Sequence, residues 1–152
     1  MLSIKKTARV VSGTGWVRPN KAKTKNKGFA RTSTSNAITF SSFGYNIPQS
    51  AVITGIKIET TRKGSRIGMS DSVSLLIPGG DAATGFAADI PINLRKRTNG
   101  GENQIPGYGM VTPTQINSSD FGILYSKVFA GIVYLDAIEV TVFYNVPAPI
   151  FI

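Results

Sequence analysis

Apolar and polar residues alternate along most of the chain with a period of two, as in β-strands that bury one face. The clearest case is the segment 133–144, where Glu139 and Thr141 point away from a shared apolar face. The apolar residues on that face are Ile138, Val140, Val142 and Tyr144. We therefore predict an antiparallel strand over 133–144 with one buried side.

Other segments show the same alternation, including 52–60, where Ile56 and Ile58 face inward and Lys57 and Glu59 outward. Val73, Leu75 and Ile77 likewise share one face. Strands are predicted at 52–60, 72–77, 121–129 and 37–47, with weaker signals at 6–12, 29–33 and 89–94. Gly and Pro turn signals separate them, and a Gly-rich stretch at 98–109 is predicted to be a loop. Seven or eight short strands predict an all-β fold, an antiparallel β-sandwich of the jelly-roll kind.

Large apolar residues on the inward faces are expected to form the core rather than a ligand groove. They are Phe43, Ile47, Ile53, Ile56, Phe121, Ile138 and Val140.

Composition narrows the picture further. The chain has 152 residues, with 28 Ile and Val against six Leu, which disfavours a helical bundle. Its length predicts one domain, with 1–11 an N-terminal arm or first strand, 12–145 the sandwich, and 146–152 a C-terminal apolar arm. Cys and His are absent, which excludes disulfides, thiolate or imidazole metal sites and an imidazole base. The start lacks a secretory signal's apolar stretch and no run is long enough to span a membrane, so we expect a soluble, unexported protein.

Charge is concentrated at one end of the sequence. Residues 1–31 contain nine basic and no acidic residues, whereas 32–152 contain eight of each. Such a segment favours an anionic partner, whether nucleic acid, acidic protein or lipid headgroups. The predicted partner-binding residues are Arg18, Lys21, Lys23, Lys25, Lys27 and Arg31.

The lysines of the basic loop 21–28 are spaced two apart and would lie on one side of an extended strand. Trp16 and Phe29 flank them, and a row of cations with nearby aromatic rings could bind single-stranded nucleic acid. No nucleic-acid-binding motif accompanies it, and charged runs more often are solvated or bind acidic protein. Nucleic-acid binding through 5–31 is therefore an alternative.

Candidate catalytic and metal-binding residues form no pattern typical of either chemistry. Ser70, Asp71, Ser72 and Asp120 could supply oxygen ligands to calcium, but EF-hand spacing is missing. No two carboxylates are placed by the sequence across a cleft, as a glycosidase needs. Asn117 begins a glycosylation sequon that we interpret as a polar turn. We expect no catalytic residues, no cofactor and no metal.

The segment after Tyr144 combines Pro147 and Pro149 with a very apolar ending. The prolines prevent it from joining a central strand. We predict a homotrimer in which the apolar residues Ile150, Phe151 and Ile152 pack on a neighbouring subunit.

Five short motifs occur in an order that resembles a β-sandwich domain of tailed-bacteriophage virion proteins. They are Gly15-Trp16-x-x-Pro19, Phe43-Gly44-x-x-Ile47-Pro48-x-x-Ala51-x-Ile53-x-Gly55-Ile56, Asp71-Ser72-Val73-x-Leu75-Leu76, Thr112-Pro113-x-x-Ile116-Asn117-Ser118-Ser119-x-Phe121-Gly122, and Leu135-Asp136-x-Ile138-x-Val140-Thr141-Val142-x-Tyr144. The resemblance spans about 12–144. The chain departs from it at 21–27, where lysines replace an acidic, small-residue stretch, and at 108–110, where a second tryptophan is expected.

The resemblance implies a non-enzymatic capsid decoration (cement) protein that binds the major capsid protein on the outer capsid surface of a virion. Asp71 and Asp136, which recur in the motifs, are expected to make turn and strand-edge hydrogen bonds. An alternative is a tail, fibre or head-fibre module that binds a host-surface receptor such as a carbohydrate. No membrane partner is expected, and nucleic acid is not the expected partner.

Overall fold

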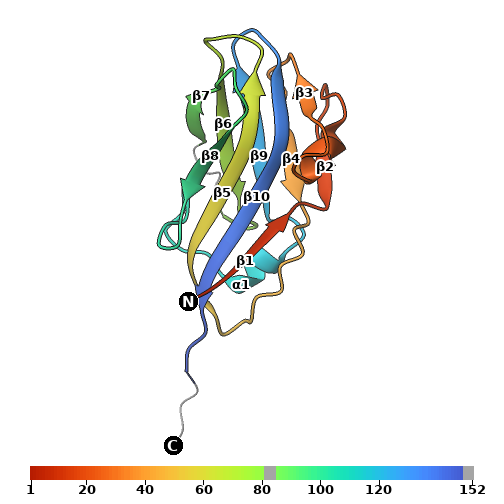
Figure 1. Cartoon of the computed structure of the whole chain (residues 1–152). Coiled ribbons are helices and arrows are strands. Elements are labelled where there is room, and N and C mark those ends of the chain that lie inside the picture. Colours follow the sequence, from red (N-terminus) through yellow and green to blue (C-terminus); the bar gives the residue numbers. More distant parts are fainter. Residues whose placement is uncertain (81–84, 149–152) are drawn as a thin grey trace, which may run out of the picture.

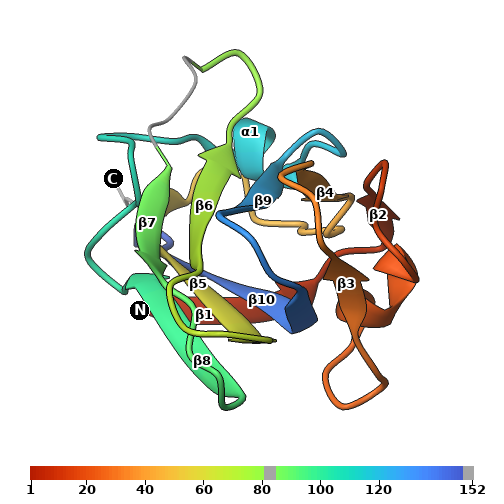
Figure 2. The same ribbon diagram turned by 90° about the horizontal axis from the view of Figure 1, so that it is seen from above.

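Two antiparallel sheets pack face to face in the computed structural model, which describes residues 1–80 and 85–148 (Figures 1 and 2). The first sheet, sheet A, has the order β1 (Leu2–Thr7), β10 (Val133–Asn145), β5 (Val52–Gly64) and β8 (Arg95–Gly100), with β3 (Ala30–Thr32) also paired to β10. The second, sheet B, has the order β2 (Val10–Ser12), β4 (Ile38–Ser41), β9 (Gly122–Val128), β6 (Ser70–Leu76) and β7 (Phe86–Asp89). The helices are η1 (Pro19–Lys23) and α1 (Pro113–Asn117), and no helix among the described residues could span a membrane.

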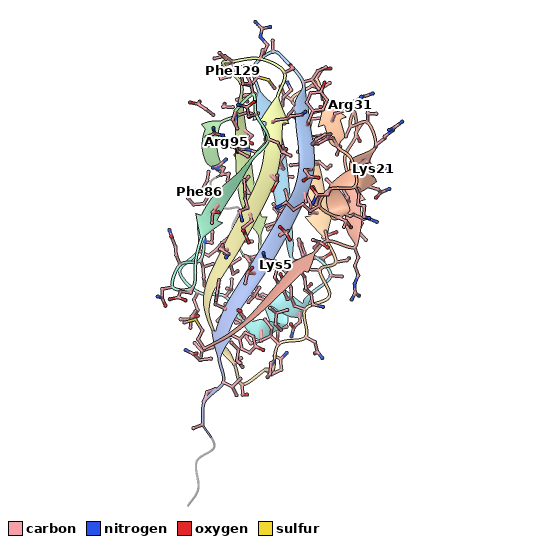
Figure 3. The ribbon with its side chains drawn as sticks, in the orientation of Figure 1. Lys5, Lys21, Arg31, Phe86, Arg95 and Phe129 are labelled. Atoms are coloured by element: carbon pink, nitrogen blue, oxygen red, sulfur yellow. The ribbon has the colours of Figure 1, made fainter. Side chains whose placement is uncertain are left out.

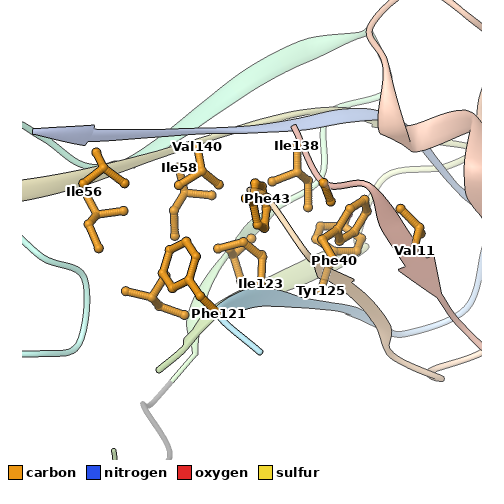
Figure 4. Close-up of a cluster of buried hydrophobic side chains, with 14 of the residues drawn as sticks. Val11, Phe40, Phe43, Ile56, Ile58, Phe121, Ile123, Tyr125, Ile138 and Val140 are labelled. Carbon is orange, nitrogen blue, oxygen red and sulfur yellow. The ribbon is translucent and has the colours of Figure 1, made fainter. Parts of the chain in front are cut away.

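The predicted β-sandwich is confirmed, and its core lies between the sheets. Every core residue named from the sequence is less than a tenth exposed, from Ile56 at 0% to Ile53 at 8%. Figure 4 shows Phe43, Phe121 and Val140 among these side chains. Strand alternation therefore identified the buried face correctly.

The longest strands, β5 and β10, are 13 residues each and pair along nearly their whole length. The predicted strand 133–144 lies within β10, and 52–60 lies within β5, which continues to Gly64. Two register shifts in this pairing, at Leu135/Ala137 and Phe143/Tyr144, mark β-bulges. A bulge bends its strand and increases its twist, which helps the strand follow the curved core.

Several strand boundaries differ from the prediction for local reasons. The segment 6–12 is divided between β1 and β2, which belong to different sheets, and residues 2–7 are the first strand, one of the two alternatives predicted for 1–11. Of 37–47 only Ile38–Ser41 is a strand, because Ser42 and Gly44 adopt positive φ angles of 56° and 73°. The predicted strand 89–94 is wrong, since it falls mostly between β7 and β8.

Strand β8 lies in the segment 95–100, Arg-Lys-Arg-Thr-Asn-Gly, which has no apolar residue to mark a buried face. The stretch 98–109 was predicted to be a loop, and its first three residues instead pair with β5. This edge strand supplies Arg97 to the interior and Lys96 to the outer face of sheet A.

Candidate binding surface

The first 31 residues lie along one side of the sandwich, so the charge asymmetry of the sequence becomes an asymmetry in space. Strand β1 is the edge of sheet A and β2 the edge of sheet B, with η1 and β3 between and beside them (Figures 1 and 2). We call this side the basic edge. Its charged residues are Lys5, Lys6, Arg9, Arg18, Lys21, Lys23, Lys25, Lys27 and Arg31.

Most of the predicted partner-binding side chains are solvent exposed at this edge. Lys21 and Arg31 project outward in Figure 3. Pro19–Lys23 forms a 3₁₀ helix rather than an extended strand, so the lysines do not follow one side of a strand as predicted. They lie on a helical turn and on the loop after it.

Asp136 holds the basic loop in place. Its Oδ1 accepts a hydrogen bond of 2.9 Å from the backbone N–H of Asn26, a residue with a φ of 65°. Asp136 is 2% exposed and lies at the bulge of β10, a central strand, so it makes the predicted hydrogen bond to a turn although it does not lie at a strand edge. Fully buried Ala22 anchors the preceding turn against the body.

The aromatic residues near the basic edge are engaged within the protein. Trp16 is 7% exposed, donates from Nε1 to the carbonyl of Asn36 at 2.9 Å, and packs edge-on against Tyr125. Phe29 packs against Tyr134, with the Lys63 ammonium 5.0 Å and 5.4 Å from the two ring centres. Trp16 is therefore a core residue, and its ring does not face solvent as the alternative of a single-stranded nucleic-acid track would require.

An open cleft lies where β1 leaves sheet A. Its volume is about 410 Å³, and Lys5, Lys6, Arg9 and Glu139 line it together with the buried ring of Phe43. Three cations against one carboxylate leave this cleft with an excess of positive charge.

The positive surface continues from Lys5 onto the outer face of sheet A, around Glu59. The Glu59 carboxylate lies 3.1 Å from the Lys5 ammonium, 3.7 Å from that of Lys57 and 2.6 Å from that of Lys96. Burial by itself would raise the pKa of Glu59, but the hydrogen bonds from Lys96 and Lys5 and the nearby positive charges lower it to about 2. Glu139, which pairs with Glu59 across β10 and β5, adds a second carboxylate, so the three ammonium groups leave a net charge of +1.

Glu59 points outward as predicted, yet the lysines cover it, and it is only 4% exposed. Sequence reasoning missed Lys96 as a member of this group because β8 was not foreseen. The group brings together side chains from β1, β5 and β8.

Asp71 is the centre of a second charged group, inside the sandwich. Its carboxylate accepts hydrogen bonds from Arg62 Nε at 2.8 Å, Arg97 Nη1 at 2.9 Å and the Tyr125 hydroxyl at 2.7 Å. Burial, followed by the charge of Asp71, raises the pKa of Tyr125. The predicted strand-edge role of Asp71 is therefore wrong, because the residue links the two sheets from within.

The candidate calcium ligands are not brought together into a site. Both carboxylate oxygens of Asp71 form ion pairs with arginines inside the sandwich. Asp120 is exposed and follows α1. Within 1–80 and 85–148, no group of three acidic residues could hold a metal ion.

The outer face of sheet B contrasts with that of sheet A. Alternation places Ser70, Ser72 and Ser74 of β6 and Ser126 of β9 on it. Among the described strands of sheet B, Asp89 of β7 is the one charged residue on this outer face. Positive charge is thus gathered on the basic edge and on sheet A.

Comparisons with known proteins give structural similarity alone. No protein-family model matches the sequence, and no curated protein matches it. The second N-terminal cellulose-binding domain of Cellulomonas fimi β-1,4-glucanase C aligns over 93% of this chain and 92% of its own, with a TM-score of 0.54 and 11% identity. The C-terminal CBM6 of the laminarinase LamC from Zobellia galactanivorans aligns over 93% and 99%, with a TM-score of 0.51 and 10% identity.

The CBM22-1 xylan-binding domain of Paenibacillus barcinonensis Xyn10C aligns over 96% of this chain and 95% of its own, with a TM-score of 0.50 and 11% identity. These similarities support the jelly-roll-like sandwich. At such low identity they extend to the fold and no further.

Proposed function

We propose that this chain is a non-enzymatic structural protein of a tailed-phage virion, a decoration protein that binds the outer surface of the capsid. The observation that carries the proposal is the basic edge, where nine cationic residues and no acidic residue of the sequence 1–31 line one side of a sandwich. The order of the five sequence motifs supports the same assignment. The proposed partners are the major capsid protein and further copies of this chain.

Binding would rest on complementary charge. Exposed lysines and arginines attract an acidic surface before contact and fix the orientation of docking. Each exposed ion pair contributes little, so affinity depends on several acting together. The sandwich supplies a rigid block that presents them.

A structural role also agrees with the carboxylates of the chain, because three of them are engaged by partners within the protein. Asp71 is paired with two arginines, Glu59 is surrounded by lysines, and Asp136 holds the basic loop. A glycosidase needs two carboxyl groups facing a substrate across a cleft. We expect no release of reducing ends when the pure protein is incubated with bacterial polysaccharide or peptidoglycan.

The number of copies per virion tests this assignment. Quantitative mass spectrometry of purified particles should find the chain on the order of hundreds of times, as repeated capsid positions allow. A count of a few to tens would instead place it in the tail or a fibre, and absence from particles would reject the virion proposal.

A second candidate is a receptor-binding module for host-surface glycan. It is favoured by the structural similarity to cellulose- and xylan-binding domains and by the half-buried rings of Tyr134 and Phe143 on the outer face of sheet A. Affinity electrophoresis in soluble cellulose derivatives and xylan tests it. Retardation of the wild type that Tyr134→Ala abolishes would support glycan binding, and unchanged mobility in both gels would count against it.

A further inference from the structure

An apolar groove lies at the end of the sandwich where β10 finishes. It has a volume of about 290 Å³, with buried Ile53, Val111 and Pro113 among the residues that line it. Val52, 58% exposed, and Met110, 84% exposed, lie at its rim. The lining residues include no charged side chain. Large apolar groups left open to water in this way mark binding sites more often than scattered single residues do.

The chain itself carries apolar residues that start beside this groove. Asn145, the last residue of β10, pairs with Val52, so the segment after it begins next to the rim. Val146, Pro147 and Ala148 are exposed and lead away from the body (Figure 1). The sequence then continues to Ile150, Phe151 and Ile152, which lie outside the described residues.

The direction of this segment favours a neighbouring molecule over its own groove. Proline fixes its own φ near −65° and keeps the residue before it extended, so Val146–Pro147 does not readily turn back. Fully extended, the seven residues 146–152 reach at most about 25 Å. A segment of this length can reach beyond its own chain without reversing direction.

We infer that the groove beside Met110 binds the apolar residues Ile150–Ile152 of a second copy of this chain. Burial of their side chains would remove apolar surface from water on both partners. The contact joins the groove of one copy to the C-terminal segment of the next, which are two different surfaces. Contacts of this kind close into a ring when the rotation between copies allows it. The inference does not depend on a virion role.

The absence of cysteine from the chain permits a direct test. The double variant Met110→Cys, Phe151→Cys is oxidised mildly and analysed on a denaturing gel without reductant. We expect covalently linked multimers. A matched control pairs Phe151→Cys with Ile67→Cys, since Ile67 is equally exposed at 84% but lies at the opposite end of β5, and it should stay monomeric.

Two results would overturn the inference. One is a monomer that retains its free thiols, and the other is a monomer whose two thiols have paired within one chain, which mass spectrometry identifies. A second measurement needs no cross-link. Light scattering of Met110→Asp should show loss of the wild-type oligomer whereas Ile67→Asp keeps it, and a monomeric wild type at high concentration would contradict the proposal.

Discussion

Asp71 illustrates how single buried polar residues hold this sandwich together. Arg62 and Arg97 belong to sheet A, whereas Asp71 and Tyr125 belong to sheet B, so the group joins the two layers. The sequence contained a signal for this position. Asp71 lies two residues before Val73, whose inward face was predicted, and extending the alternation by one step places the carboxylate inside. The sequence could not identify the arginine partners, because Arg97 comes from the unforeseen strand β8.

Replacement of Asp71 by Asn should strongly destabilise the protein. It leaves two arginines in the interior without a compensating charge, and breaking a buried ion pair in this way costs about 3 to 5 kcal/mol. Urea unfolding measures the loss. Asp120→Asn, at an exposed position, should stay within about 0.5 kcal/mol of the wild type. A loss of less than about 1 kcal/mol for Asp71→Asn would show that the arginines find other partners.

Glu59 should make stability depend on acid pH. Its pKa falls from the ordinary 4.5 to about 2 in the folded protein, so its ionised form stabilises the fold above the unfolded pKa. This contribution is complete above about pH 5 and disappears as the pH falls through about 2. The free energy of unfolding of Glu59→Gln should therefore vary less between pH 6 and pH 2 than that of the wild type. If the free energy of unfolding of both proteins varied equally with pH, the ion pairs of Glu59 with the lysines would not be the cause of the acid sensitivity.

At the scale of elements, the strands that alternate apolar and polar residues were predictable and those without apolar residues were not. Strands β6 and β9 bury roughly every second side chain, whereas β5 and β10 bury most of their residues, and the alternation of apolar and polar residue types identified all four. Strand β8 carries charge on both faces, since Arg97 reaches the interior ion group, so no period-two signal exists. The alternation also gave no sign of where a strand ends at a turn. The predicted strand 37–47 ends at Ser41 because Ser42 has a positive φ.

Two of the sequence motifs meet in space through α1. Thr112 caps this helix in a capping box with Gln115, and Pro113 occupies its first turn. Asn117 at its end accepts from the N–H of Ile47 at 2.8 Å and donates to the carbonyl of Ile47 at 2.9 Å. The predicted polar turn is present, since Ser118 Oγ accepts from the N–H of Asp120, but the Asn117 side chain secures a segment 70 residues away.

Asn117→Ala should therefore loosen the loop that contains Ile47. The substitution leaves a backbone donor and a backbone acceptor unpaired, at a cost of about 1 to 3 kcal/mol for each group that stays buried. Hydrogen exchange at the Ile47 amide should speed up together with a fall in thermal stability. Thr114→Ala, which removes an exposed hydrogen bond to Gln49 on the same helix, is the control and should change little. Unchanged exchange at Ile47 would contradict the proposed clamp.

The whole molecule is divided by charge. Positive side chains occupy the basic edge, its cleft and the lysine group on sheet A, while sheet B presents serines. The concentration of basic residues in 1–31 is visible in the sequence, and most of these side chains are exposed in the structure. It could not predict that Lys5 and Lys96 meet around Glu59, since these residues lie on strands far apart in sequence. Nor could it predict that Trp16 is buried, because its core contact with Tyr125 comes from the other end of the chain.

Binding of the purified chain to tailed-phage heads stripped of it tests the central claim most directly. The account predicts saturable co-sedimentation that weakens as salt rises, because exposed charges are screened beyond about 8 Å at physiological ionic strength. The variant with Ser at Lys21, Lys23, Lys25 and Lys27 should fold normally and bind less. Lys25→Ser with Lys27→Ser should bind less than its matched control, Arg66→Ser with Arg95→Ser, since all four side chains are exposed but only the first pair lies on the basic edge. Heads that do not bind the wild type, together with DNA or RNA oligomers that bind it at physiological salt, would contradict the account and make nucleic acid the partner.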